Sequence, residues 1–598
     1  MTLSASDVKK IGPWNPGIKS TLPSNYLPLS TMFRSENVTT TFETATELSD
    51  FSGLPIQQLI RFRAERLVVH ELLIRVSADI FVSDGSKYED LGVNFRKVVS
   101  TLLDTYIQPY MAEIIHRFND FEQLVKLTVD HELSLDLFPE PIEVTSVEKT
   151  FNFKNMFKIQ KKKQKIHNFE TIEIRDQRLI ALWQQKETVT CDPMQQSVLC
   201  ALAKIANAIV IKHGRLMGEK SLLSSLITGE VCNELGSKMI GEIITPLIND
   251  AAIKENFLIL PPQKKPVIIN IKGASASGKS TMRPLQKKHT EALDINWHDF
   301  ALISPDIWRK YLLDYESLGK AYKYAGTLAG DELPIIDHKL DLYISQKAKQ
   351  GKLSHLLVDR FRFDSFAARS DAKEGSNLVT RFGHTIYMVF VVTPPEETVE
   401  RSWKRGLRVG RFKAVDDLLD HNIEALKGIP VLYFTWALRK DKLVYCEFLD
   451  NSVDFAKQPK TIAFGVNDEL YILDIKCMID INRFSKLNIN AESSSQVYLS
   501  ESAIAPEFNT DFLVKCAKKI PTINFVDRVS SKIYACMESG EISWVDPKIL
   551  SRILEDENNK IGFLSIAPCL IENLCEIIKQ PARLITPEAI RHTMGDLS

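Results

Sequence analysis

The segment 273–280 constrains the fold of this chain more than any other feature. Its sequence, GASASGKS, fits the pattern G-x-x-x-x-G-K-[ST] of a phosphate-binding loop. In such a loop the glycines let the backbone curl so that N–H groups point at phosphate oxygens, the lysine reaches the β- and γ-phosphates, and the last hydroxyl, that of Ser280, can bind Mg²⁺. A β-branched run at 267–271 precedes the segment, and a helical stretch follows it. The residues predicted to hold a nucleotide are Gly273, Ala274, Ser275, Ala276, Ser277, Gly278, Lys279, Ser280 and Thr281.

Strand and helix patterns alternate around and after this loop. Short apolar runs predict strands at 267–271, 300–303, 355–358, 386–392 and 443–449, with helical stretches between them. Strands separated by helical crossovers imply a parallel sheet that is covered on both faces. The sequence therefore predicts an α/β fold, with a P-loop kinase domain at residues 261–455.

The regions on either side have different patterns. Residues 1–260 predict a mainly helical N-terminal region, with an irregular stretch up to about residue 50, and the Pro-rich segment 261–266 marks its end. Residues 456–598 predict a smaller C-terminal region. There a strand pair at 461–464 and 470–479 comes first, and mainly helical structure follows, with a final helix starting at Thr586-Pro587-Glu588.

Asp306 is a candidate general base. It follows the second predicted strand in the order Ser304-Pro305-Asp306, where Ser304 can cap a helix and Pro305 suits its first position. One interpretation is an acid that the helix dipole favours. The other is a carboxylate at the carboxyl end of a strand, placed to accept a proton from a substrate hydroxyl. The residues alone do not decide between the two.

A basic segment follows the fourth predicted strand and its Thr393-Pro394-Pro395 end. Kinases of small molecules and nucleotides use such a lid to bring cations over the transferring phosphoryl group, which needs charge neutralisation more than covalent help. The third strand ends in Asp359, but Arg360 stands where a motor ATPase would have a second acid. The cations of the lid are Arg401, Lys404, Arg405, Arg408 and Arg411.

Residues 267–452 resemble the zeta toxin family of P-loop kinases in the order of these elements. This segment is about a third of the chain. The resemblance rests on the phosphate loop, the segment 304–309, Asp359 with Arg362 three residues later, Pro394, Gly410-Arg411, and Asp450-Asn451. It implies that Asp306 is the base, that Asp359 contacts substrate or metal, and that Arg362 contacts substrate. It also implies that the lid arginines are Arg405 and Arg411, for which Arg401 and Arg408 compete.

The chain departs from the family pattern on the acceptor side of the site. It has Asp359 where the family commonly has glutamate, and it lacks a His-Pro pair shortly after the catalytic aspartate. The resemblance implies ATP and Mg²⁺ as cofactors and an acceptor similar to a UDP-sugar. The departures concern that acceptor and leave the ATP half of the site unchanged.

Composition limits which binding partners and which cellular compartment we expect for this chain. The 75 Lys and Arg residues balance 76 Asp and Glu, so the charge gives no case for a dedicated nucleic-acid binder. The nine cysteines include no C-x-x-C pair, which argues against a disulfide framework or a zinc array. We find no secretory signal pattern and no apolar run of membrane-spanning length. These observations predict a cytoplasmic protein without a membrane span.

The sequence thus predicts a Mg-ATP-dependent kinase that phosphorylates a hydroxyl of a small molecule or nucleotide. Two alternatives stay open. In one, the loop binds nucleotide as a regulatory switch and the flanking regions bind a protein partner. In the other, the kinase acts on a protein or RNA hydroxyl. Asp306 and the lid arginines favour the first prediction, because a pure switch would not need them.

Overall fold

The computed structural model describes residues 11–87, 89–139, 171–360, 379–454, 457–568 and 577–598. The chain forms two compact units. The first, here called the sheet unit, contains Met1–Thr31, Leu72–Tyr106 and Ile248–Ser598. The second, the helical unit, contains Met32–Glu71 and Ile107–Leu247. These units do not follow the predicted boundaries at 260 and 455, because an early part of the chain belongs with the sheet.

The five predicted strands are confirmed, and they are parallel. They lie side by side in the order β2-β3-β1-β4-β5, with β1 in the middle. Nearly every residue of these strands is buried, as expected for a parallel sheet covered on both faces. Their bounds are β1 Val267–Gly273, β2 Phe300–Ile303, β3 His355–Asp359, β4 Thr385–Val392 and β5 Leu443–Asp450.

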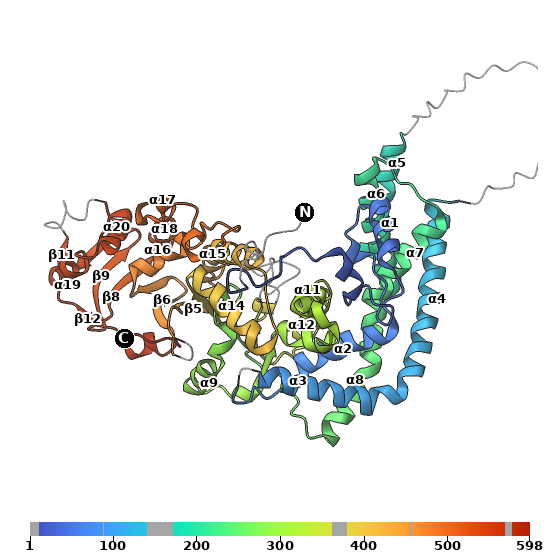
Figure 1. The fold of residues 1–598 in the computed structure, drawn as a ribbon, viewed down its shortest axis with the longest axis horizontal. Coiled ribbons are helices and arrows are strands. Elements are labelled where there is room, and N and C mark those ends of the chain that lie inside the picture. Colours follow the sequence, from blue (N-terminus) through green and yellow to red (C-terminus); the bar gives the residue numbers. More distant parts are fainter. Residues whose placement is uncertain (1–10, 88, 140–170, 361–378, 455–456, 569–576) are drawn as a thin grey trace, which may run out of the picture. The chain divides into compact units, whose positions relative to one another are not determined.

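The same sheet continues without a break into the C-terminal region (Figure 1). In the described residues it has 12 strands, and because β6 pairs antiparallel with β5, the sheet is mixed. The predicted helices after the strand pair are present, but the strands β8 to β12 that lie between them were not predicted. The added strands are β6 Lys460–Val466, β7 Glu469–Ile472, β8 Thr522–Asp527, β9 Lys532–Glu538, β10 Glu541–Val545, β11 Ile578–Lys579 and β12 Arg583–Leu584.

The second strand of the predicted pair is also shorter than expected. It ends at Ile472, because the Asp474 side chain accepts a hydrogen bond from the Cys477 N–H at 2.9 Å and starts a helix, α16. The helix predicted to start at Thr586 is confirmed as α21. The helices of this region are α16 Ile475–Arg483, α17 Glu501–Ile504, α18 Asp511–Lys519, α19 Pro547–Ile553, α20 Glu557–Ile566 and α21 Pro587–Ile590.

Helices cover both faces of the sheet. On one face, Met388 and Phe390 of β4 share a core with α15, α16, α18 and α20. On the other face, the preceding residue Tyr387 contacts the His289 ring of α9, with 5.3 Å between the ring centroids. The helices between the first five strands are α9 Arg283–Ala292, α10 Arg309–Leu312, α11 Ala325–Leu328, α12 Glu332–Lys349, α14 Pro395–Val409 and α15 Val415–Ala437.

The segment Leu72–Tyr106 packs in the sheet unit although it comes early in the chain. The Trp308 indole donates to the Ser77 hydroxyl at 3.1 Å, and the Tyr343 hydroxyl donates to Asp79 at 2.6 Å. These bonds hold the end of α2 (Ala64–Asp79) against the segment after β2 and against α12. The segment also contains α3, Asp90–Thr101.

The helical unit confirms the helical character predicted for most of the first 260 residues. The stretch predicted to be irregular up to about residue 50 is shorter than expected, because Thr41 caps α1 by accepting from the Thr44 N–H at 3.2 Å. The helices of this part of the chain are α1 Phe42–Ser52, α4 Met111–Asp136, α5 Ile172–Val189, α6 Pro193–His213, α7 Lys220–Val231 and α8 Ser237–Lys254.

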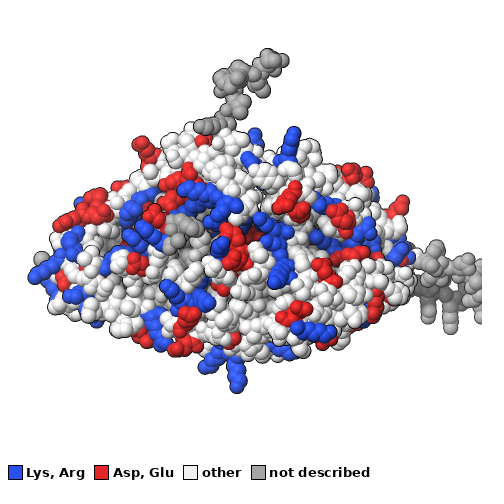
Figure 2. All heavy atoms as spheres, turned by 60° about the horizontal axis from the view of Figure 1, so that its bottom comes forward, with Lys and Arg blue, Asp and Glu red and all other residues white. Residues whose placement is uncertain are grey.

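Among the described residues, only α6 is long and apolar enough to cross a membrane, by length and composition alone. It packs against α5 and α7, and its buried residues belong to the core of the helical unit. On the face drawn in Figure 2, basic and acidic side chains of the described residues are interspersed.

Candidate active site

The carboxyl ends of the five parallel strands meet at one edge of the sheet. The phosphate loop leaves β1 there, Asp306 follows β2, and Asp359 ends β3. Thr393 and Asn451 follow β4 and β5 at the same edge. The chain adds β2 and β3 on one side of β1 and β4 and β5 on the other, so this edge is a topological switch point, where open α/β sheets bind ligands.

Side chains from β4 and β5 brace the phosphate loop. Thr393 Oγ1 and Asn451 Nδ2 both donate to the Ser277 carbonyl, at 3.0 and 2.7 Å. Gly278 has φ of +97°, and a Cβ at this position would lie 2.2 Å from Asn451 Nδ2. Only glycine therefore fits here without moving the brace. The chain continues as a 3₁₀ turn, Lys279–Met282, before α9 starts.

Lys279 is buried inside the curl of the loop. Its Nζ donates to the carbonyls of Gly273 and Ala274 at 2.9 and 2.8 Å. Burial lowers the pKa of Lys279, and the carboxylates of Asp359 and Asp306 oppose that shift. The lysine and both predicted acids are thus close enough to act on one another.

Asp306 is held by two arginines. Its Oδ2 accepts from Arg411 Nη2, and its Oδ1 accepts from Arg309 Nε at 3.2 Å. Burial tends to raise the pKa of Asp306, but the guanidinium groups of Arg411 and Arg309 outweigh it and hold the pKa well below its usual range. About 45% of the side chain is still exposed to solvent, so the ionised carboxylate is accessible.

The expected cap of the segment around Asp306 is absent. Residues Pro305–Trp308 form a 3₁₀ turn, and Ser304 makes no side-chain hydrogen bond at its start. The prediction that Ser304 caps a helix was therefore wrong. Because the turn is so short, the two ion pairs dominate the environment of Asp306 more than a helix dipole does.

The structure separates the four candidate lid arginines into two pairs. Arg401 bonds to Glu397 and to the Asn451 carbonyl, both at 2.7 Å, and Arg408 pairs with Glu89 at 3.0 Å.

The charges of Arg405 and Arg411, by contrast, act on both Lys279 and Asp306. Of the predicted pair, Arg411 contacts Asp306 directly, and Arg405 is close enough for its charge to act on Lys279 and Asp306. Lys404 belongs to α14, the helix that carries Arg405.

The end of β3 carries two charged residues with separate partners. Asp359 accepts a hydrogen bond from the Ser280 hydroxyl of the phosphate loop. Arg360 is fully buried and pairs with Asp337 at 2.8 Å and with Asp341, both on α12. Arg360, which stands where a motor ATPase would have a second acid, thus links the end of β3 to α12. Arg362 lies outside the described residues.

Sequence reasoning missed a cluster on the other side of the loop. Lys413, Asp417 and His421 follow the lid at four-residue spacing, and Lys413 and His421 contact the Ser275 hydroxyl at 3.3 and 3.0 Å. The spacing was a usable signal, because it places Asp417 and His421 on one face of α15, with Lys413 just before the helix starts.

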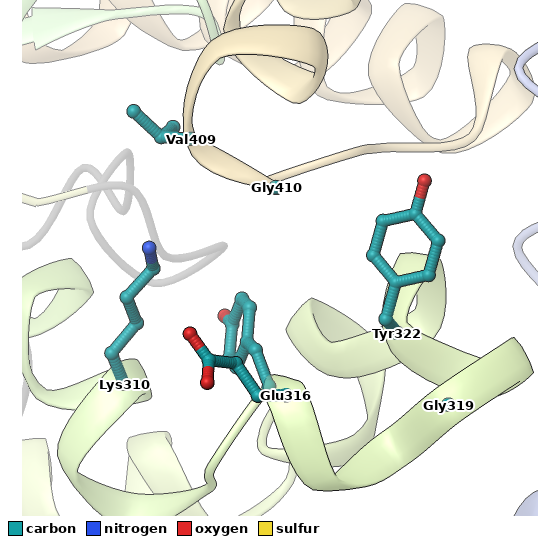
Figure 3. Close-up of a pocket in the computed structure, with 7 residues that line it drawn as sticks. Lys310, Glu316, Gly319, Tyr322, Val409 and Gly410 are labelled. Atoms are coloured by element: carbon teal, nitrogen blue, oxygen red, sulfur yellow. The ribbon is translucent and has the colours of Figure 1, made fainter.

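A cavity of about 440 Å³ lies between the segment after Asp306 and the end of α14 (Figure 3). Its size is within the range of small-molecule sites. Burial raises the pKa of the Tyr315 phenol, and the charges of Arg411 and Asp306 also act on it, so one wall of the cavity lies near the Asp306 carboxylate. The cavity is lined by Lys310, Tyr315, Glu316, Gly319, Tyr322, Val409 and Gly410.

The chain matches no protein-family model, and comparison with curated proteins and with solved structures gives no match. The assignment of this site therefore rests on its own geometry and chemistry.

Proposed function

We propose that this protein is a Mg-ATP-dependent phosphotransferase of the P-loop kinase type, similar to zeta toxins, that phosphorylates a hydroxyl of a small molecule or nucleotide. The observation that carries the proposal is the ion pair between Asp306 and Arg411 beside Lys279. A carboxylate and a guanidinium beside a phosphate loop supply the two groups that phosphoryl transfer needs, one for the attacking hydroxyl and one for the transferred phosphate.

The phosphate half of the site is rich in cations. Lys279, Arg405 and Arg411 share one electrostatic environment with the loop. In the proposed reaction the loop N–H groups and Lys279 hold the β- and γ-phosphates, while the two arginines neutralise charge that develops as the phosphoryl group moves.

Asp306 is the proposed general base, in the part of the site where the hydroxyl-bearing substrate would bind. Its carboxylate is ionised, so it can accept a hydrogen bond from an attacking hydroxyl and then its proton. Arg411 bonds to the same carboxylate, and this lowers the basicity of Asp306. When Arg411 turns to the transferring phosphate, Asp306 becomes a stronger base at the moment when the hydroxyl attacks.

The cavity between Tyr315 and Gly410 is the proposed acceptor site. Tyr315 in its wall is close enough to Asp306 to feel its charge, and the cavity offers aromatic faces together with an ammonium and a carboxylate, from Lys310 and Glu316. These groups suit an acceptor that has a ring and several polar substituents. A small molecule or a nucleotide fits this description.

The residues present fit Mg²⁺. This ion binds through one or two carboxylates together with substrate phosphates, and the Ser280 hydroxyl and the Asp359 carboxylate already lie within a hydrogen bond of each other. When bound, the ion would neutralise phosphate charge. Ser280 and Asp359 would hold it beside the loop.

The proposal is tested by incubating the purified protein with γ-labelled ATP and a metabolite extract, and by identifying the labelled product. Product should form with the wild type and should be nearly lost with Lys279→Ala. Asp314→Asn is a matched control, because Asp314 is an exposed acid that caps the next turn, accepting from the Glu316 N–H at 3.0 Å, and should keep full activity. Failure of the wild type to bind ATP, or equal labelling by Lys279→Ala, would reject the proposed function.

A further inference from the structure

A buried cation next to the phosphate loop has no role in the function proposed above. Lys413 lies in the loop between α14 and α15, with 14% of its side chain exposed. Its Nζ lies 3.3 Å from the Ser275 hydroxyl and 3.3 Å from Asp417, and it also contacts His421 Nδ1. An ammonium is thus held against the phosphate loop by two side chains of α15.

His421 and Asp417 hold this ammonium in a defined way. Burial lowers the pKa of His421 to about 2, so the ring is neutral near pH 7. His421 Nε2 lies 3.2 Å from Asp417, which suits a ring that carries its proton on Nε2. Nδ1 then has one lone pair that can accept from the Lys413 ammonium, and the ammonium can also donate to the Ser275 hydroxyl. The cluster therefore forms a fixed support for Lys413.

The charges around Lys413 come from several elements. Burial lowers the pKa of Lys413 to about 7, and Asp417 opposes the shift, while Arg405 of α14 and Arg309 of α10 add to it. His421 also senses Lys279 of the loop and Asp306. Lys413 thus shares one electrostatic environment with the rest of the site. A phosphate bound in the loop would add negative charge there and favour the charged form of Lys413.

We propose that Lys413 is a second phosphate-contacting cation of the loop, positioned by His421 and Asp417, and that it takes up a proton when ATP binds. This inference rests on the proposed function. Ser275 belongs to the segment whose N–H groups face the phosphates, so an ammonium 3.3 Å from its hydroxyl is within reach of a phosphate oxygen. Lysine is a common phosphate ligand that acts as a point charge.

The sign of the pH dependence follows from the two forms of Lys413. Below about pH 7 the ammonium is already charged, so ATP meets a cation. Above that pH the free protein has a neutral amine, and ATP binding must draw a proton from solvent. If bound phosphate restores an ordinary lysine pKa, binding at pH 8 takes up about 0.9 proton, and the Kd rises by up to about tenfold per pH unit above pH 7.

The test is calorimetric titration of Mg-ATP into the full chain at pH 7.0, 8.0 and 9.0, in two buffers of different ionisation enthalpy. The wild type should take up a proton at pH 8, and its affinity should fall toward pH 9. Lys413→Arg keeps a charge at all three pH values, so it should bind without proton uptake and with little pH dependence. Lys413→Met should bind more weakly than Lys413→Arg throughout.

Asp417→Asn adds a second measurement, the pH at which ATP affinity falls. This pH would not change if Lys413 had only a structural role. Asp417 raises the pKa of Lys413, so its loss should move the fall in affinity to lower pH. Equal proton uptake by the wild type and Lys413→Arg would overturn the inference. If Lys279→Ala abolished ATP binding while the Lys413 variants behaved like the wild type, only this inference would fail. If the wild type bound no ATP, the proposed function would fail first.

Discussion

Asp306→Asn gives the sharpest test of the proposed chemistry. Asparagine keeps the size of the side chain but cannot accept the proton of an attacking hydroxyl. General-base catalysis contributes about 10²–10⁴-fold, so kcat should fall by that factor. The ATP affinity should stay within a few-fold, because Lys279 and the loop N–H groups are unchanged. Turnover and nucleotide binding should be measured on one preparation.

The structure also sets the expected loss of stability. The carboxylate loses ion pairs with Arg411 and Arg309, and about 45% of its side chain is exposed. Exposed pairs contribute about 0.2–1 kcal/mol each, so the melting temperature should fall by a few degrees at most. Because the folded pKa of Asp306 is depressed, this contribution is complete above the unfolded pKa and is lost only in acid. The stability difference between wild type and variant should therefore be constant from pH 6 to 9.

One result would refute this reasoning. If Asp306→Asn turned over ATP at nearly the wild-type rate, Asp306 would be only a partner of two arginines. The base would then be Asp359 or solvent. Asp314→Asn, at an exposed acid nearby, controls for a general effect of removing a charge and should leave both rate and melting temperature close to those of the wild type.

Other substitutions separate the roles of the remaining charged residues. Lys279→Ala should remove nearly all phosphoryl transfer, because no other residue of the segment 273–281 carries a positive charge, and turnover within a few-fold of wild type would contradict this. Arg405→Ala and Arg411→Ala should lower kcat more than ATP affinity, whereas Arg408→Ala, whose side chain pairs with Glu89, should do neither. If Arg408→Ala strongly lowered kcat in steady-state assays, the assignment of the lid arginines would be wrong. Arg360→Met should cost about 3–5 kcal/mol in chemical denaturation, because it leaves two buried carboxylates without their cation.

Much of the fold follows from local sequence patterns. The apolar runs of β1 to β5 are continuous and are separated by helical stretches, so their strands were predictable, and the helices between them favour parallel pairing. The strands β8 to β12 were not predicted. Pairing of β6 with β5 and of β9 with β12 depends on partners chosen in three dimensions. Propensity along the chain does not specify such partners.

The site was predictable where a motif fixes its geometry. Strand order and the parallel direction bring Lys279, Asp306 and Asp359 to one edge of the sheet, so their nearness follows from topology. The pairing of Arg411, but not Arg408, with Asp306 could not be read from spacing. Gly410 ends α14 in the left-handed region with φ of +73°, and this turns the chain so that Arg411 leaves the helix face. The contact of Lys413 with Ser275 depends on that same turn.

The division of the chain between the two units has a consequence for biosynthesis. All residues of the helical unit precede Ile248, so a ribosome synthesises this unit completely before it reaches β1. The segment Leu72–Tyr106 is synthesised early as well, but its packing partners, Trp308 and Tyr343, appear more than 200 residues later. Domains tend to fold in the order of their synthesis. The segment therefore stays without these partners while more than 200 further residues are synthesised, and a chaperone that binds apolar segments would find it exposed in that interval.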